Sequence, residues 1–190
     1  MQLTQHLRRL AIAAAITSTA VVIPAVALAA AGPSATRSAT APASRCLTAD
    51  LTDWLGYPGS QTAGSTYYQL EISNISHRTC TLYGFPGVSA VRNAQRQEGS
   101  PAGRVGGHAE NLLTLAPGST VHVILQITDV YNFGLSACHP VQAFGLRVYA
   151  PGAYSWRLVG LTFEACSRRG PVFLHVSTTI AGTGIPGYSS

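Results

Sequence analysis

The sequence predicts an all-β domain, an immunoglobulin-like antiparallel β-sandwich with two disulfides. Apolar and polar residues alternate in several short runs, which is the pattern of strands that bury one face in a core. Turn residues separate these runs, and the chain contains 19 glycines and 11 prolines. No segment keeps a helical period over eleven residues, and only 10% of the 190 residues are charged. These features disfavour a long helical bundle or a coiled coil.

The first 29 residues have the three parts of a secretory signal peptide. Arg8 and Arg9 precede a long apolar run, and the small residues Ala27 and Ala29 stand where a signal peptidase cuts. The alternative interpretation of this run is an uncleaved membrane anchor. Residues 30–45 are small and polar and predict a disordered linker. We therefore expect a single β-sandwich domain over residues 46–188, secreted or associated with the cell wall.

Each expected strand alternates apolar and polar side chains between turn residues rich in glycine, proline and asparagine. The clearest alternation runs from Val121 to Ile127. In the last strand, Val172, Leu174 and Val176 are expected on one face and Phe173 on the other. The expected strands cover residues 66–73, 80–82, 88–91, 112–115, 121–127, 144–148, 156–163 and 172–176.

Two segments do not fit this strand pattern. Residues 93–110 are rich in Gly, Gln and Arg and predict a long loop. A short turn is expected around Thr48–Leu55, with the carboxylates of Asp50 and Asp53 capping it.

Four cysteines follow the signal peptide: Cys46, Cys80, Cys138 and Cys166. An even number of cysteines in an exported chain predicts disulfides, and four cysteines allow three connectivities. Sequential pairing, first with second and third with fourth, would close two loops of similar size. A metal site is disfavoured, because the chain has no Cys-x-x-Cys and only His139 stands beside a cysteine.

The charges and motifs do not indicate common enzymes or nucleic-acid binding. All 12 basic residues are arginines, and they are scattered rather than clustered with aromatic residues. A Gly-x-Ser-x-Gly nucleophile motif and a phosphate-binding glycine loop are both missing. His122 and His175 could lie on neighbouring strands and share a metal, although separate boundary positions are favoured. We therefore expect no catalytic residues, no metal and no cofactor.

Aromatic residues at strand edges and in loops are the better functional indication. Exposed aromatic rings beside polar groups suit surfaces that bind sugars or proteins. The competing and favoured interpretation is that Trp156 and some of the tyrosines fill the core. The residues concerned are Trp54, Tyr57, Tyr67, Tyr131, Tyr149, Tyr154 and Trp156.

These observations favour a non-catalytic binding or structural module at the cell exterior. Its partner would be an unknown protein or carbohydrate, with no nucleic acid and, after signal cleavage, no membrane. The loops 93–110 and 128–142 are the candidate contact surfaces. The alternative is a secreted protease inhibitor or another enzyme-regulating protein, with Asn132–Pro140 beside Cys138 as the inhibitory segment.

One motif resembles a known family. The pattern Asn74-x-Ser76-x-x-x-Cys80-x-Leu82-x-Gly84-Phe85-Pro86-Gly87 is similar to the hallmark of exported actinobacterial proteins, number 4232 in the domain-of-unknown-function series. The resemblance implies secretion or envelope attachment, a β-sandwich and two disulfides, and it implies no activity. Many members of this family look like lipoproteins, whereas here Ala43-Ser44-Arg45 before Cys46 is no lipobox.

The same motif also has a physical interpretation as a turn. Gly84 and Gly87 permit backbone angles that other residues avoid, and Pro86 fixes the turn between strands. Phe85 is expected at the edge of the core. A turn beside a disulfide is therefore favoured over a binding site at this motif.

Overall fold

The computed structural model describes residues 42–62, 64–93 and 96–185. The predicted signal peptide, most of the predicted linker and the predicted domain end at residue 188 lie outside these ranges. Within them, no helix is long and apolar enough to cross a membrane.

Strands dominate the described residues, with only three short helical segments, two of them 3-10 turns (η) and one a single α-turn. The elements in chain order are η1 (Thr48–Asp50), β1 (Leu51–Thr62), β2 (Ser65–Asn74), β3 (Cys80–Tyr83), β4 (Gly87–Val91), β5 (Gln97–Glu98), β6 (Gly103–Arg104), β7 (Leu112–Leu115), β8 (Thr120–Thr128), η2 (Val130–Asn132), α1 (Leu135–Cys138), β9 (Pro140–Tyr149), β10 (Arg157–Cys166), β11 (Leu174–Val176) and β12 (Ile180–Ala181).

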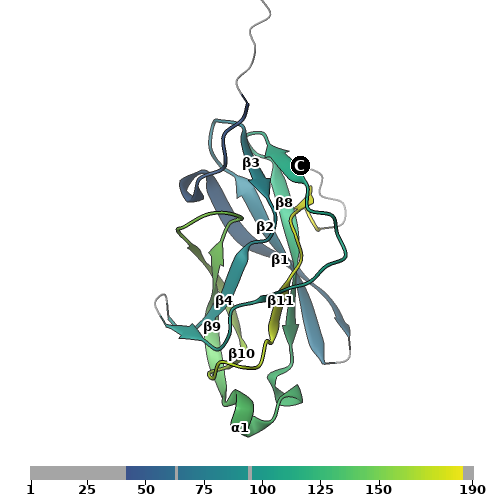
Figure 1. Ribbon diagram of the computed structural model, residues 1–190, viewed down its shortest axis with the longest axis vertical. Helices are drawn as coiled ribbons and strands as arrows, with labels where there is room; N and C mark the ends of the chain where they lie inside the picture. The colour runs from purple at the N-terminus through teal and green to yellow at the C-terminus, as the bar shows by residue number, and fades with distance from the viewer. Residues whose placement is uncertain (1–41, 63, 94–95, 186–190) are drawn as a thin grey trace, which may run out of the picture. The chain divides into compact units, whose positions relative to one another are not determined.

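The strands form two main sheets and one ribbon (Figure 1). The larger sheet has the order β1-β2-β8-β11-β6, and β12 also pairs with β8. The smaller sheet has the order β10-β9-β4-β5, and the ribbon consists of β3 and β7. The prediction of an all-β fold is confirmed, whereas the immunoglobulin-like topology stays a prediction.

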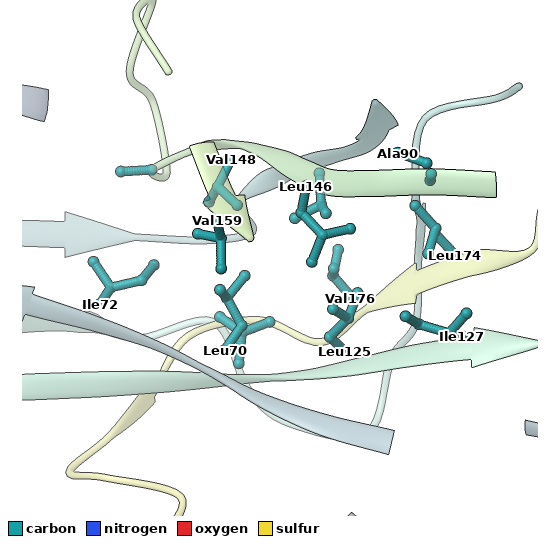
Figure 2. Packing of buried hydrophobic residues seen from close by; sticks show 14 of the residues in the cluster. Leu70, Ile72, Ala90, Leu125, Ile127, Leu146, Val148, Val159, Leu174 and Val176 are labelled. Carbon is teal, nitrogen blue, oxygen red and sulfur yellow. The ribbon is translucent and has the colours of Figure 1, made fainter. Parts of the chain in front are cut away.

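The core lies between the two main sheets and explains the alternation in the sequence. Figure 2 shows Leu70 and Leu125 of the larger sheet facing Leu146 and Val159 of the smaller sheet. All four side chains are buried, and successive residues of each strand point to opposite faces. In β8 every second residue from Val121 to Ile127 is buried, as predicted.

The first strand was not predicted. The 3-10 turn ends at Asp50, and Leu51 to Leu55 form the start of β1, which pairs with β2 from Leu51 opposite Asn74. The expected turn is therefore wrong beyond Asp50. The polar Asp53 faces the same way as Leu51 and Leu55, which conceals the alternation in the sequence.

The loop expected over residues 93–110 contains two short strands, β5 and β6. Strand β6 runs parallel to β11, with Gly103 opposite His175, so the larger sheet is not wholly antiparallel.

The side chains of the last predicted strand also differ from expectation. Phe173 is fully buried just before β11, whereas Val172 is 37% exposed. Strand β11 begins only at Leu174, so the alternation does not extend to these two residues, although the Phe173 carbonyl already accepts from the Thr128 N–H.

Candidate functional site

Two disulfides join sequential cysteines, as the sequence allowed. Cys46 pairs with Cys80 and Cys138 pairs with Cys166. All four cysteines are buried in the core cluster. Disulfides persist in oxidising environments, so both bridges are consistent with an extracellular location.

The Asn-x-Ser part of the family motif is a buried hydrogen-bond centre. The Asn74 amide nitrogen donates to the carbonyls of Arg78, at 2.9 Å, and Leu115, at 3.0 Å. Its amide oxygen accepts from the backbone N–H of Ser76 at 3.0 Å and from the Ser76 hydroxyl at 2.7 Å. Asn74 is fully buried, so all of its polar atoms find partners inside the protein. The motif here stabilises the turn between β2 and β3.

The Gly-Phe-Pro-Gly part also contacts neighbouring backbone. Gly84 has φ +91°, which favours glycine, and its carbonyl accepts from the N–H and hydroxyl of Thr179 and from the hydroxyl of Thr178. Gly87 lies in β4 without a positive φ, so the special backbone angle expected there is wrong. The ring of Phe85 lies below the Arg104 guanidinium, 5.3 Å from its centroid.

A polar cavity of about 410 Å³ opens where the β1–β2 hairpin meets β8, η2 and β10. We call it the cup. Its volume falls in the range of small-molecule sites. Its apolar lining comes from Ile127, Val130 and Phe163, while hydroxyls, an amide and two carboxylates supply the polar lining. The polar and aromatic residues are Gln61, Thr62, Ser65, Thr66, Thr128, Asp129, Tyr131 and Glu164.

Backbone hydrogen bonds fix the wall of the cup that Asp129 and Tyr131 supply. The Asp129 carboxylate accepts from the Tyr131 N–H at 2.9 Å and caps η2. The Asp129 N–H donates to the carbonyl of Gly64 at 2.7 Å, and the Asn132 amide nitrogen donates to the same carbonyl at 3.2 Å. Gly64 has φ +75°, and a Cβ there would stand 2.4 Å from the Asn132 side chain. The loop after β8 is therefore held against the β1–β2 turn.

Part of the cup could be anticipated from the sequence. Tyr131 is one of the aromatic residues that the sequence indicated as functional. The loop 128–142 was predicted as a candidate contact surface. Ser65, Thr66 and Glu164 carried no signal, because single hydroxyls and carboxylates are common on strands. Only the pairing of the strands brings them to one place.

The aspartates near the first turn have different roles. The Asp50 carboxylate accepts from the Leu47 N–H at 2.7 Å and pairs with Arg78, so it caps the turn as expected. Burial opposes its ionisation, but these two donors prevail and lower its pKa. Asp53 lies in β1 and caps nothing, so that expectation is wrong. Burial raises the pKa of Asp53 to about 6, against the opposing charge of Arg157.

Another buried carboxylate lies under the C-terminal segment. Glu71 is fully buried and accepts from the Gly184 N–H at 2.9 Å. Burial raises its pKa, although the Gly184 N–H and His122, which is its partner across the strands, favour the charged form. His122 itself lies 2.9 Å from the Gly182 carbonyl. These contacts tie residues 182–184 to the outer face of the larger sheet.

The histidines considered for a shared metal lie apart. His122 lies on β8, opposite Ile180 of β12. His175 lies on β11, opposite Gln126 of β8, which is four residues further along β8 than His122. Four residues along a strand correspond to roughly 13 Å. In the part of the chain that the structure describes, no three metal-ligating side chains gather.

The tryptophans do not fill the core, which corrects the favoured expectation. Trp54 and Trp156 are each 37% exposed, and Tyr154 is 97% exposed. The Arg147 guanidinium lies over the Trp156 ring at 5.1 Å. Core positions next to Trp156 on β10 and β9 are taken by aliphatic side chains such as Val159 and Leu146. Trp54, Tyr154 and Trp156 are therefore surface residues.

The segment considered as a protease-inhibiting loop has helical turns. Asn132 ends η2, Leu135–Cys138 form α1, and His139 has φ 48°. A loop that imitates a protease substrate presents an extended backbone. Nothing in this geometry favours the inhibitor hypothesis.

Comparisons with known proteins give the family. No curated protein and no solved structure matches the chain significantly. A family model described as a domain of unknown function, DUF4232, matches residues 46–171. This range contains the Asn74–Gly87 motif, both disulfides and every residue that lines the cup. The chain belongs to the DUF4232 family.

Proposed function

We propose that this protein is an exported, non-catalytic binding module whose cup holds a carbohydrate. The observation that supports the proposal is the lining of the cup, with hydroxyls, an amide and carboxylates around an apolar floor and an exposed tyrosine. Sugars combine hydroxyl groups with apolar C–H faces, and an aromatic ring covers such faces while the polar groups fix orientation. The two disulfides agree with a site outside the cell.

The hydroxyls of the cup support binding rather than catalysis. The Ser65 hydroxyl accepts from the Gln126 amide at 3.0 Å and lies 3.5 Å from the Thr128 hydroxyl. Neither partner can act as a general base, which an activated serine requires. The carboxylate of Asp129 is engaged in capping η2. These groups are suited to hydrogen bonding with a ligand.

The test is calorimetric titration of the purified protein with β-1,4-linked oligomers of glucose and of N-acetylglucosamine. Tyr131 is 62% exposed at the cup, so Tyr131→Ala should leave the fold intact and weaken binding about tenfold. Tyr154→Ala is the matched control, because this tyrosine is exposed and lies outside the cup. Failure of both sugar series to bind, or equal affinity of Tyr131→Ala and the wild type, would refute the proposal.

A further inference from the structure

The outer face of the smaller sheet carries a row of exposed apolar side chains. Phe144 of β9 is 53% exposed, Leu158 of β10 is 50% exposed, and Trp156 just before β10 is 37% exposed. Leu146 and Val159 are paired across β9 and β10 and point into the core. The next pair, Arg147 and Leu158, therefore points away from the core.

Arg147 holds part of this row in place. The Arg147 guanidinium lies over the indole of Trp156 at 5.1 Å and restrains the ring. Gly145 and Gly160 are paired beside Leu158. Gly145 is buried, and a Cβ there would lie 3.0 Å from Cδ1 of Leu158, so the Leu158 side chain covers this glycine. A Cβ on Gly160 would have no atom within 4 Å, so no side chain stands over the sheet at that point. We call Phe144, Trp156, Leu158 and the exposed Gly160 the platform.

The size of the platform argues against a protein partner. Three side chains exposed by 37–53% present roughly 300 Å² of surface, given the usual size of aromatic residues. A stable protein interface buries about 800 Å² on each partner. Exposed aromatic rings beside the uncovered backbone of Gly160 instead suit the flat C–H face of a sugar. Sugars with equatorial hydroxyls, as in β-1,4-linked glucose or N-acetylglucosamine, have such faces.

Strand β10 connects the platform with the cup. Phe163 and its partner Ala143 point inward, so the next pair, Glu164 and Gln142, points outward. Glu164 also lines the cup. Leu158 and Glu164 are six residues apart on one strand, roughly 20 Å. A chain of sugars can therefore follow β10 from one surface to the other.

We infer that the ligand is a β-1,4-linked polysaccharide, whose end sits in the cup and whose following sugars stack on the platform. This inference rests on the proposed function, because it names the polymer that the cup holds. It requires that affinity increase with chain length once the oligomer extends beyond the cup. Polysaccharide attachment would then depend on Trp156 although this residue lies outside the cup.

The experiment measures affinity for dimers to hexamers of N-acetylglucosamine and of glucose. In the wild type, affinity should rise about tenfold or more from the trimer to the hexamer. Trp156→Ala should remove this rise and leave dimer binding unchanged, and Phe144→Ser, a second variant on the platform, should reduce it. Tyr83→Ala is the control, because Tyr83 is 56% exposed on β3, away from the platform.

The outcomes separate the two proposals. Dimer binding that depends on Tyr131, with equal length dependence in the wild type and Trp156→Ala, would refute the platform and leave the cup. Hexamer binding that depends on Trp156 but not on Tyr131 would refute the cup and leave the platform. A wild type that dimerises, and becomes monomeric in Trp156→Ala, would show that this face binds a second copy and would overturn the inference. Circular dichroism and a thiol assay confirm that each variant is folded and oxidised.

Discussion

Replacing Asn74 by alanine tests whether the family motif is a structural centre. The change removes two hydrogen bonds donated to the carbonyls of Arg78 and Leu115 and two accepted from Ser76. Each internal hydrogen bond contributes about 1 kcal/mol net, and a buried group left without a partner costs more. The Ser76 hydroxyl still reaches the Arg78 carbonyl at 3.2 Å, which offsets part of the loss. We expect Asn74→Ala to lower the free energy of unfolding by about 3 kcal/mol.

Urea denaturation followed by tryptophan fluorescence measures this loss. For a domain of this size, about 3 kcal/mol corresponds to a melting temperature lower by roughly 6–12 °C. Asn111→Ala is the matched control, because Asn111 is exposed and its amide makes one long contact, 3.5 Å, with the Ala109 carbonyl. A loss below about 0.5 kcal/mol for Asn74→Ala, the range of ordinary surface substitutions, would contradict the structural role.

Two further predictions concern a buried charge and a tight turn. The pKa of Asp53 is about 6 in the folded protein and 3.8 in an ordinary aspartate. Between these pH values the folded state binds more protons than the unfolded state, so stability falls as the pH rises from 3.8 to about 6. Asp53→Asn should therefore be more stable than the wild type at pH 7.5, by at most about 3 kcal/mol, and should lose this advantage below about pH 4. Urea denaturation of both proteins at the two pH values measures the difference. An equal advantage at both pH values would exclude the charge of Asp53 as the cause. Gly99→Ala should destabilise the protein far more than Gly118→Ala. Both glycines have a positive φ, but a Cβ at Gly99 would lie 2.5 Å from the Cys166 carbonyl oxygen, whereas a Cβ at Gly118 would have no atom within 4 Å. Thermal melts of the two variants compare them, and equal melting temperatures would show that the backbone angle alone decides the cost.

Alternation predicted the strands that have one face in the core. Strand β8 lies at the centre of the larger sheet, and its sequence shows the pattern directly because every second residue from Val121 to Ile127 is buried in the core. Strand β1 is an edge strand, and Asp53 occupies an inward position, so the sequence there resembled a turn. The short strands β5 and β6 consist of two residues each, too few to show any period.

The proposed binding surfaces were predictable only as residue types. Tyr131 and Trp156 were recognised as aromatic residues near loops, but their exposure depends on what packs beside them. Arg157 is opposite Val148, which points into the core. Successive residues of a strand point to opposite faces, so Trp156, the residue before Arg157, points away from the core. The hydroxyls and carboxylates of the cup have no local signature at all.

The sequence by itself determined the all-β class, the presence of disulfides and the family. These features depend on local alternation, on the number of cysteines and on one contiguous motif. Tertiary structure alone decided which cysteines pair, where the cup lies and which aromatic residues reach the surface. The reason is physical: each of these depends on strands distant in sequence, and their contacts are chosen by how the two sheets pack.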